Sequence, residues 1–139
     1  MKIAVIHGPN LNLLGKREPD IYGTKTLMEL NQEIENHFAD KNELKFFQSN
    51  HEGAIIDFLH DTSGWSDAFI INPAAYTHTS YAIRDAISAI NVPCVEVHLS
   101  DINKRESFRK TSVIKPVCVK QISGLGFQSY ISAIKFLLS

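Results

Sequence analysis

Short apolar runs and longer amphipathic runs alternate along the chain. The apolar runs are rich in β-branched and aromatic residues, which is typical of buried parallel strands, and they cover residues 2–7, 44–49, 68–72, 94–99 and 117–122. Between them, apolar side chains recur at intervals of three and four residues. This spacing predicts helices over residues 26–39, 52–60, 79–90 and 126–138, with a short helical piece at 105–110.

Five strands that alternate with helices predict an α/β fold built from right-handed βαβ units around a parallel sheet. By analogy with other doubly wound sheets, we expect a flavodoxin-like strand order with helices on both faces. A chain of 139 residues is long enough to bury a continuous core and fits one domain. We therefore expect residues 1–139 to form a single catalytic domain.

The composition excludes several classes of protein. A hydrophobic content of 44% with 21% charged residues is that of an ordinary globular protein. The 14 basic and 15 acidic side chains are balanced, and no run of Lys and Arg is interleaved with aromatics, so no nucleic-acid partner is expected. Without a leader or a bilayer-spanning apolar stretch, we expect a cytoplasmic protein with no membrane partner. Cys94 and Cys118 are interpreted as reduced core residues in strands.

Polar residues collect after the predicted strands, where ligands bind in such sheets. Four strand ends share this character, at residues 7–10, 48–52, 72–78 and 96–100. Each one alone is explained by turn formation, because Asn, Ser and Pro favour turns and caps. Four together favour a functional site.

The connection from Gly8 to Lys25 is about three times the usual length, which is typical of a lid or a binding loop. It contains Arg17 and Tyr22. A guanidinium at about 4 Å could stabilise a tyrosinate enough to make it a general base near neutral pH. The alternative is a packing tyrosine and a solvated arginine.

Glu96 and His98 stand two residues apart and so point to the same face of a strand. A carboxylate there can orient an imidazole and favour its protonated form, which suits a proton donor. The alternative is a satisfied buried ion pair. His78 precedes a helix and could bind substrate or only start that helix, and no pairing is predicted for His7, His51 or His60.

Several familiar chemistries are absent from the sequence. Residues 8–15 match neither a P-loop nor a dinucleotide-binding fingerprint, and no nucleophile elbow or metal-spaced histidine pair is present. The candidate chemistry that remains is acid–base catalysis by Tyr, His and Arg side chains.

Four blocks in this order resemble the type II 3-dehydroquinate dehydratases of the shikimate pathway. They are GPNLNLLGKREPDIYG at 8–23, QSNHEGAIIDFLH at 48–60, INPAAYTHTSYAIRDAI at 71–87 and VEVHLSDINKRESFRKTS at 95–112. The resemblance covers nearly the whole chain. It implies a flavodoxin-like enzyme that uses no cofactor, no metal and no lysine Schiff base, and that assembles as trimers grouped into a dodecamer.

The resemblance also implies roles for individual residues. Tyr22 would be the base that removes a proton beside the substrate ketone, with Arg17 keeping the tyrosine ionised. Asn10 would hold the water that stabilises the enolate, and His98, oriented by Glu96, would protonate the departing hydroxyl. The substrate would be bound by Asn72, His78, Arg109, the backbone amides of Leu99 and Ser100, and Asp85 of a neighbouring subunit.

Two other hypotheses stay open from the sequence. The fold alone would suit a module that binds a flavin or a nucleotide. A catalytically idle oligomer is also possible, although it leaves the set of Arg17, Tyr22 and His98 unexplained.

Overall fold

A five-stranded parallel sheet forms the centre of the computed structural model, which describes residues 1–16 and 19–139 and, within them, all side chains but those of Ile21 and Tyr22. The strand order is β2-β1-β3-β4-β5, the flavodoxin-like order. The strands are β1 (Lys2–His7), β2 (Glu43–Gln48), β3 (Ala68–Asn72), β4 (Cys94–Val97) and β5 (Lys120–Ile122). The predicted fold class is confirmed.

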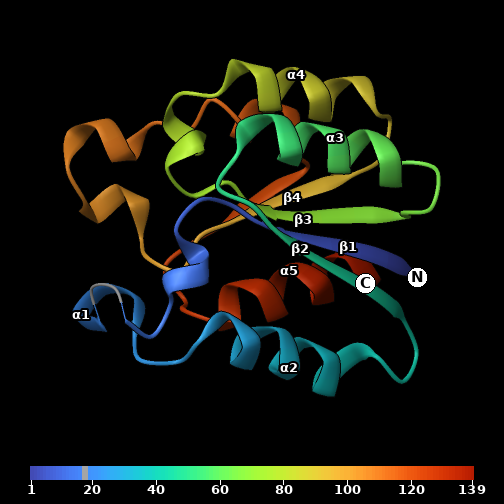
Figure 1. Ribbon diagram of the computed structural model, residues 1–139, viewed down its shortest axis with the longest axis horizontal. Helices are drawn as coiled ribbons and strands as arrows, with labels where there is room; N and C mark the ends of the chain where they lie inside the picture. The colour runs from blue at the N-terminus through green and yellow to red at the C-terminus, as the bar shows by residue number, and fades with distance from the viewer. Residues whose placement is uncertain (17–18) are drawn as a thin grey trace.

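Two layers of helices cover the sheet. Figure 1 shows α3 (Glu52–Thr62) and α4 (Tyr81–Ala89) on one face, and α2 (Leu27–Phe38) and α5 (Gln128–Leu138) on the other. Side chains of a strand point alternately to its two faces. In β1, Ile3 and Val5 therefore pack in the core cluster of α2 and α5, whereas Ala4 and Ile6 pack in that of α3 and α4.

The boundaries of α2, α3, α4 and α5 agree with the predicted helices to within two residues. The capping box that opens α2 is formed: Thr26 Oγ1 accepts the Glu29 backbone N–H, and the Glu29 carboxylate accepts the Thr26 backbone N–H. Single turns of 3₁₀ helix complete the fold, at Leu11–Leu13, Ala74–His78, Ile102–Lys104, Ser107–Lys110 and Lys115–Val117.

The connection after β1 is not the structureless loop that its length suggested. It contains the 3₁₀ turn Leu11–Leu13 and the one-turn helix α1 (Pro19–Tyr22). Leu11 and Leu14 are buried in the core cluster of α2 and α5, so the first half of the connection is held against the body of the protein.

The last strand begins three residues later than predicted. Val117 belongs to a 3₁₀ turn in which its N–H is donated to the Ile114 carbonyl. Pro116 has no N–H for a strand ladder. The Val119 N–H is donated to the Cys94 carbonyl at 2.9 Å, and the register with β4 begins at Lys120. Cys118 is consequently outside the strand and half-buried, which corrects its interpretation as a core strand residue, whereas Cys94 is buried as expected. Both thiols are free.

In the described part of the chain, no helix combines the length and apolar character needed to cross a bilayer.

Candidate active site

The carboxyl ends of β1 and β3 are brought unusually close together. The Gly8 N–H is donated to the Asn72 carbonyl at 2.8 Å, and a Cβ at Gly8 would lie 2.6 Å from the Pro73 carbonyl oxygen. Only glycine permits this approach. The chain then turns at Asn10, which has a left-handed backbone (φ 69°) and donates its N–H to the Asn50 side chain at 2.9 Å.

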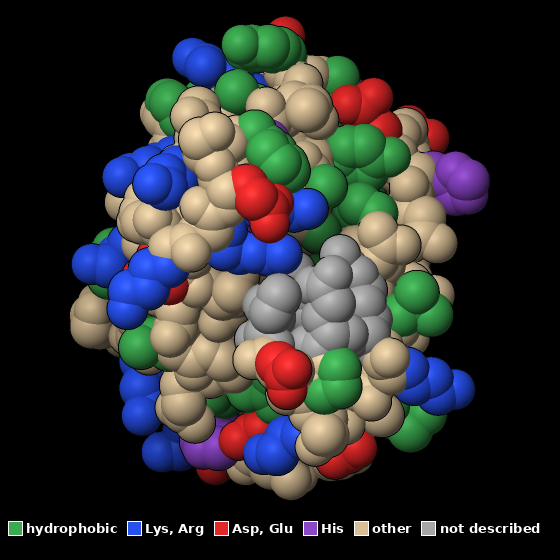
Figure 2. All heavy atoms as spheres, turned by 90° about the vertical axis from the view of Figure 1, so that its left-hand side faces the viewer, with side chains coloured by type: hydrophobic (Ala, Val, Ile, Leu, Met, Phe, Trp, Pro, Cys, Tyr) green, Lys and Arg blue, Asp and Glu red, His purple; other side chains and the backbone are tan. Residues whose placement is uncertain are grey.

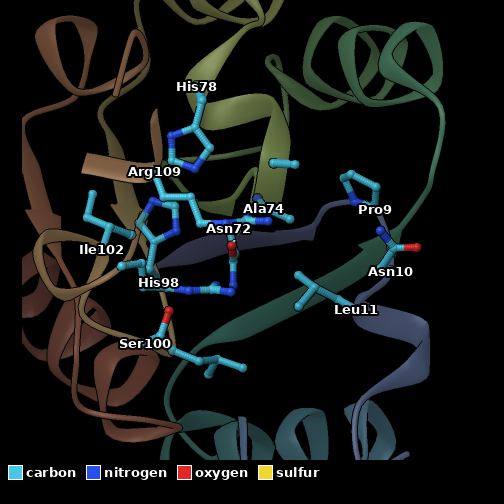
Figure 3. Close-up of a pocket in the computed structure, with 13 residues that line it drawn as sticks. Pro9, Asn10, Leu11, Asn72, Ala74, His78, His98, Ser100, Ile102 and Arg109 are labelled. Atoms are coloured by element: carbon cyan, nitrogen blue, oxygen red, sulfur yellow. Dashed lines mark hydrogen bonds between the residues drawn. The ribbon is translucent and has the colours of Figure 1, made fainter. Parts of the chain in front are cut away.

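A pocket opens at this end of the sheet, where the segments after β1, β3 and β4 meet. Figure 3 shows His98 and Arg109 converging on it with Asn72 behind them, and Figure 2 shows the basic side chains that gather on this face of the molecule. Among the residues that the structure describes, thirteen line the pocket: Pro9, Asn10, Leu11, Asn72, Ala74, Ala75, His78, His98, Leu99, Ser100, Ile102, Arg105 and Arg109. Seven of the ten predicted site residues are among them, namely Asn10, Asn72, His78, His98, Leu99, Ser100 and Arg109.

His98 is held by a buried carboxylate. Its Nε2 lies 2.6 Å from Glu96 Oε2, and both side chains are almost inaccessible to solvent. Because the carboxylate only accepts hydrogen bonds, Nε2 carries a proton, and Nδ1 is the ring nitrogen left for other chemistry. The expected contact between Glu96 and His98 is present.

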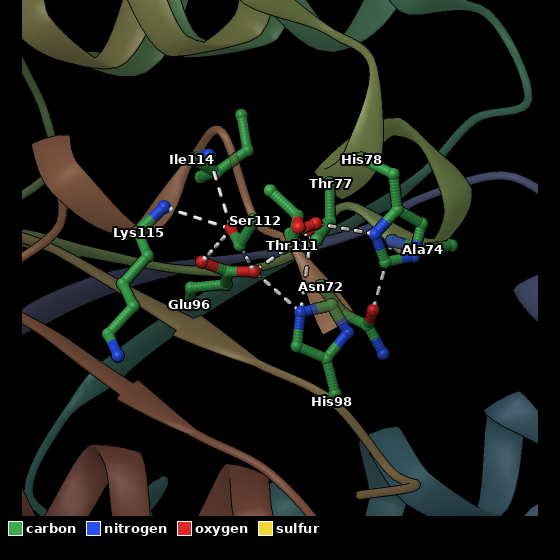
Figure 4. A network of polar contacts seen from close by, with 10 residues as sticks. All are labelled: Asn72, Ala74, Thr77, His78, Glu96, His98, Thr111, Ser112, Ile114 and Lys115. Carbon is green, nitrogen blue, oxygen red and sulfur yellow. Dashed lines mark hydrogen bonds and ion pairs between the residues drawn. The ribbon is translucent and has the colours of Figure 1, made fainter. Parts of the chain in front are cut away.

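Two hydroxyl groups fix the carboxylate in turn (Figure 4). Thr77 donates its hydroxyl proton to Glu96 Oε2 at 2.9 Å, and the Ser112 hydroxyl lies 2.9 and 3.0 Å from the two carboxylate oxygens. Ser112 itself accepts the backbone N–H groups of Ile114 and Lys115. Glu96 is therefore locked in place from two separate segments of the chain.

Opposing effects set the pKa of Glu96. Burial is the largest and raises it, but the hydrogen bond and the charge of His98 together with the hydroxyls of Ser112 and Thr77 outweigh burial. The pKa of Glu96 is consequently lowered, and the carboxylate remains ionised beside His98.

His78 and Arg109 line the pocket beside His98 (Figure 3). His78 donates Nδ1–H to the Thr111 carbonyl at 2.7 Å, which leaves Nε2 as its other polar atom. Arg109 is held by Glu106, 2.6 Å from its Nε. With Arg105 also in the lining, two guanidinium groups make the pocket suited to an anionic ligand.

Asn72 is 3% exposed at the end of β3. Its Oδ1 accepts the Ala74 backbone N–H at 3.1 Å. Ala74 has a left-handed backbone with φ 53°, which is strained for a residue with a Cβ. This strained turn places Ala74 and Ala75 in the pocket wall.

Three predicted site residues are not placed in the pocket. Arg17 and the side chain of Tyr22 lie outside the described residues. Asp85 is exposed on α4, and it is not one of the described residues that line the pocket of its own chain. In the part of the chain with described placement, no three His, Cys, Asp or Glu side chains are grouped to hold a metal ion.

Three residues of the site were not predicted from the sequence. Thr77 and Ser112 are 19 and 16 residues from Glu96, and a lone hydroxyl carries no spacing signal. Arg105 was placed on the short helical piece but given no role.

Comparisons with known proteins bear on the chemistry of this pocket. A family model described as dehydroquinase class II matches residues 1–138. The chain belongs to the class II dehydroquinase family. A 3-dehydroquinate dehydratase from Halothermothrix orenii is 54% identical over 139 residues, which are 99% of this chain and 94% of that protein.

Solved structures agree with the dehydroquinase assignment. The type II dehydroquinase from Butyrivibrio crossotus superposes with a TM-score of 0.98 at 49% identity, covering 100% of this chain and 98% of that one. The type II dehydroquinase from Propionibacterium acnes gives a TM-score of 0.94 at 36% identity, with 98% and 94% covered. The chain thus shares the fold of these two type II dehydroquinases over at least 98% of its residues.

Proposed function

We propose that this chain is a hydro-lyase that eliminates water reversibly from 3-dehydroquinate to give 3-dehydroshikimate. The step serves the shikimate pathway of aromatic amino-acid biosynthesis or the breakdown of quinate. The observation that carries the proposal is the imidazole of His98, held by the ionised Glu96 in the pocket of a class II dehydroquinase. Family membership favours this reaction over a flavin-binding or nucleotide-binding module and over an idle oligomer.

Loss of water β to a ketone needs a base, a stabiliser of the enolate and an acid. In the proposed mechanism, Tyr22 removes the proton beside the ketone while Arg17 stabilises the tyrosinate. Electrons of the broken C–H bond move to the ketone oxygen, where a water held by Asn10 stabilises the enolate. As the enolate collapses, the C–O bond breaks, and the hydroxyl takes a proton from His98 and departs as water.

The residues that line the other parts of the pocket are proposed to bind the substrate. Arg109 carries the positive charge that a carboxylate requires. The Asn72 amide can donate to a hydroxyl group and His78 Nε2 can accept from one, and the backbone amides of Leu99 and Ser100 complete the set. The proposed reaction needs no cofactor.

We also propose a cytoplasmic assembly of trimers grouped into a dodecamer, in which Asp85 enters the pocket of a neighbouring subunit. The exposed position of Asp85 on α4 supports this contribution in trans. Mixing Asp85→Ala chains, in which substrate binding should be weakened, with Tyr22→Phe chains, which should lack turnover, tests it, because mixed oligomers would regain some pockets with both residues. Mixtures without any recovered turnover would contradict the shared site.

The function is tested by adding 3-dehydroquinate to the purified protein in the presence of a metal chelator and following the ultraviolet absorbance of the conjugated enone product. We expect a steady rise that depends on protein concentration. A flat trace from folded protein would refute the proposed function.

A further inference from the structure

Ser112 lies on the connection between β4 and β5, three residues after Arg109. It is not one of the described residues that line the pocket, and the proposed mechanism does not use it. Its hydroxyl oxygen is 2.9 Å from Glu96 Oε1 and 3.0 Å from Glu96 Oε2. Figure 4 shows the contacts that run from Ser112 through the carboxylate to His98.

The backbone determines where the Ser112 proton goes. Ser112 Oγ accepts the Ile114 N–H at 3.2 Å and the Lys115 N–H at 3.0 Å. A hydroxyl group has two lone pairs and one proton. Because both lone pairs are occupied by the backbone, the proton is donated to Glu96, and the hydroxyl cannot turn away without giving up the two backbone contacts.

The two carboxylate oxygens of Glu96 have different partners. Oε2 lies 2.6 Å from His98 Nε2 and 2.9 Å from the Thr77 hydroxyl, whereas among the described residues the partner of Oε1 is Ser112. The last torsion of a glutamate side chain has only a broad preference of its own, so hydrogen bonds determine the plane of the carboxylate. Glu96 is closed to solvent, and bulk water therefore cannot replace a lost donor at Oε1.

We propose that Ser112 is a positioning residue for the acid, because its hydroxyl sets the plane of the Glu96 carboxylate that presents Oε2 to His98. Without this donor, the carboxylate can rotate, and the imidazole that it holds loses its fixed orientation in the pocket. The inference deepens the proposed function and rests on it, since His98 is there the acid. It assigns an effect on turnover to a hydroxyl outside the pocket.

The same hydroxyl helps to keep Glu96 ionised. Burial raises the pKa of Glu96, and the hydrogen bond from Ser112 is one of the effects that lower it, after the hydrogen bond and the charge of His98. Cys94 lies on the same face of β4, but its thiol stays neutral because its pKa is raised by Cys118, by burial and by the charge of Glu96. Loss of the Ser112 hydroxyl should therefore raise the pKa of Glu96, and the carboxylate should take up a proton at a higher pH.

The backbone around Ser112 is anchored independently of its side chain. The Thr111 carbonyl accepts His78 Nδ1–H at 2.7 Å, and the Val113 N–H is donated to the Thr77 carbonyl at 2.8 Å. The segment that carries the substrate-binding arginine should stay attached through these bonds when only the hydroxyl is lost. A positioning role should consequently lower kcat and spare KM, whereas a general collapse of the segment should raise KM.

The test compares Ser112→Thr with Ser112→Val, two replacements of the same shape of which only threonine carries a hydroxyl. We expect Ser112→Val to lower kcat with 3-dehydroquinate about tenfold at pH 7, close to the effect of one lost hydrogen bond to a charged group, with KM within about threefold. Ser112→Thr should keep kcat within about threefold of wild type. On the acid side, the fall of kcat should begin about one pH unit higher in Ser112→Val than in Ser112→Thr.

Two results would overturn the positioning role. One is an equal kcat in Ser112→Val and Ser112→Thr, because a merely structural role depends on shape and not on the hydroxyl. The other is a raised KM with a wild-type kcat in Ser112→Val. If neither variant folds, Ser112→Ala removes the hydroxyl without adding atoms and should show the tenfold loss of kcat, and a wild-type kcat in it would equally overturn the proposal.

A measurement without substrate separates this inference from the proposed function. ¹³C NMR of the glutamate carboxyl carbons, with Glu96 assigned by the signal that Glu96→Gln lacks, should show Glu96 titrating about one pH unit higher in Ser112→Val than in Ser112→Thr. Identical signals in the two variants down to the pH of acid unfolding would refute the effect of Ser112 even in an active enzyme. The expected titration in a protein that does not convert 3-dehydroquinate would refute the function and leave the effect of Ser112 on Glu96 intact.

Discussion

Replacing Glu96 by glutamine removes one negative charge from beside His98 and changes the shape of the side chain very little. In the wild-type structure, the carboxylate oxygen lies 2.6 Å from His98 Nε2 in a site closed to solvent. It stabilises the protonated imidazole that the proposed mechanism needs as its acid. An amide keeps a dipole there but no charge. With its oxygen toward His98 and Thr77, its NH₂ group takes the place of Oε1 and meets the Ser112 hydroxyl.

The size of the effect follows from the distance. Opposite unit charges 2.6 Å apart attract by about 6 kcal/mol at an effective dielectric constant of about 20. Because the amide dipole and nearby groups compensate in part, we expect a loss of about 2–3 kcal/mol. This corresponds to a kcat about 30- to 150-fold lower at pH 7.

Enone absorbance with 3-dehydroquinate measures kcat and KM, and urea unfolding followed by circular dichroism measures stability. The matched control is Glu52→Gln, because Glu52 also accepts a serine hydroxyl, that of Ser80, but is not one of the described residues that line the pocket. We expect Glu52→Gln to keep the wild-type kcat. A kcat within about threefold of wild type in Glu96→Gln would refute the role of the buried charge.

Three further predictions concern the base, the core histidine and a helix cap. Tyr22→Phe should abolish turnover while equilibrium dialysis still detects substrate binding, and near-normal turnover would exclude Tyr22 as the base. Burial lowers the pKa of His7 to about 4 in the folded protein, against 6.5 when unfolded. As the pH falls from 6.5 through 4, the unfolded chain therefore binds a proton at His7 before the folded chain does. This difference should remove up to about 3 kcal/mol from the free energy of unfolding. Urea unfolding at pH 7 and pH 4.5 should show a smaller acid loss in His7→Asn than in wild type, and equal losses would contradict this. Thr26→Ala removes the cap of α2 and should cost about 1 kcal/mol in urea unfolding, with Thr24→Ala, an exposed threonine before the helix, as a neutral control.

The fold was predictable because burial imposes a period on the sequence. Strands β1 and β3 are apolar almost throughout since both of their faces are covered, and the apolar residues of α2 repeat at helical spacing because one side meets the sheet. The start of β5 was not predictable in this way. An apolar residue such as Val117 suits a strand and a turn equally well. The turn around Pro116 determines where pairing with β4 begins.

The site was predictable where geometry follows from topology. Asn10, Asn72 and His98 stand after different strands, and a parallel sheet brings those ends to one edge, so their meeting in one pocket was accessible from sequence. Contacts made by residues elsewhere in the chain were not predictable from the sequence. The hydroxyls of Thr77 and Ser112 reach Glu96 only because two connections fold back over β4, and residues this far apart have no common period.

We propose that His98 is the acid of a dehydration carried out in this pocket. The most direct test is the rate of enone formation by wild type and by His98→Gln, whose amide can occupy the space of the ring and contact Glu96 but cannot deliver a proton. We expect the rate of His98→Gln to be about 10²- to 10⁴-fold below that of wild type, the range typical of a lost general acid, with substrate still bound. Turnover by His98→Gln at the wild-type rate would contradict it.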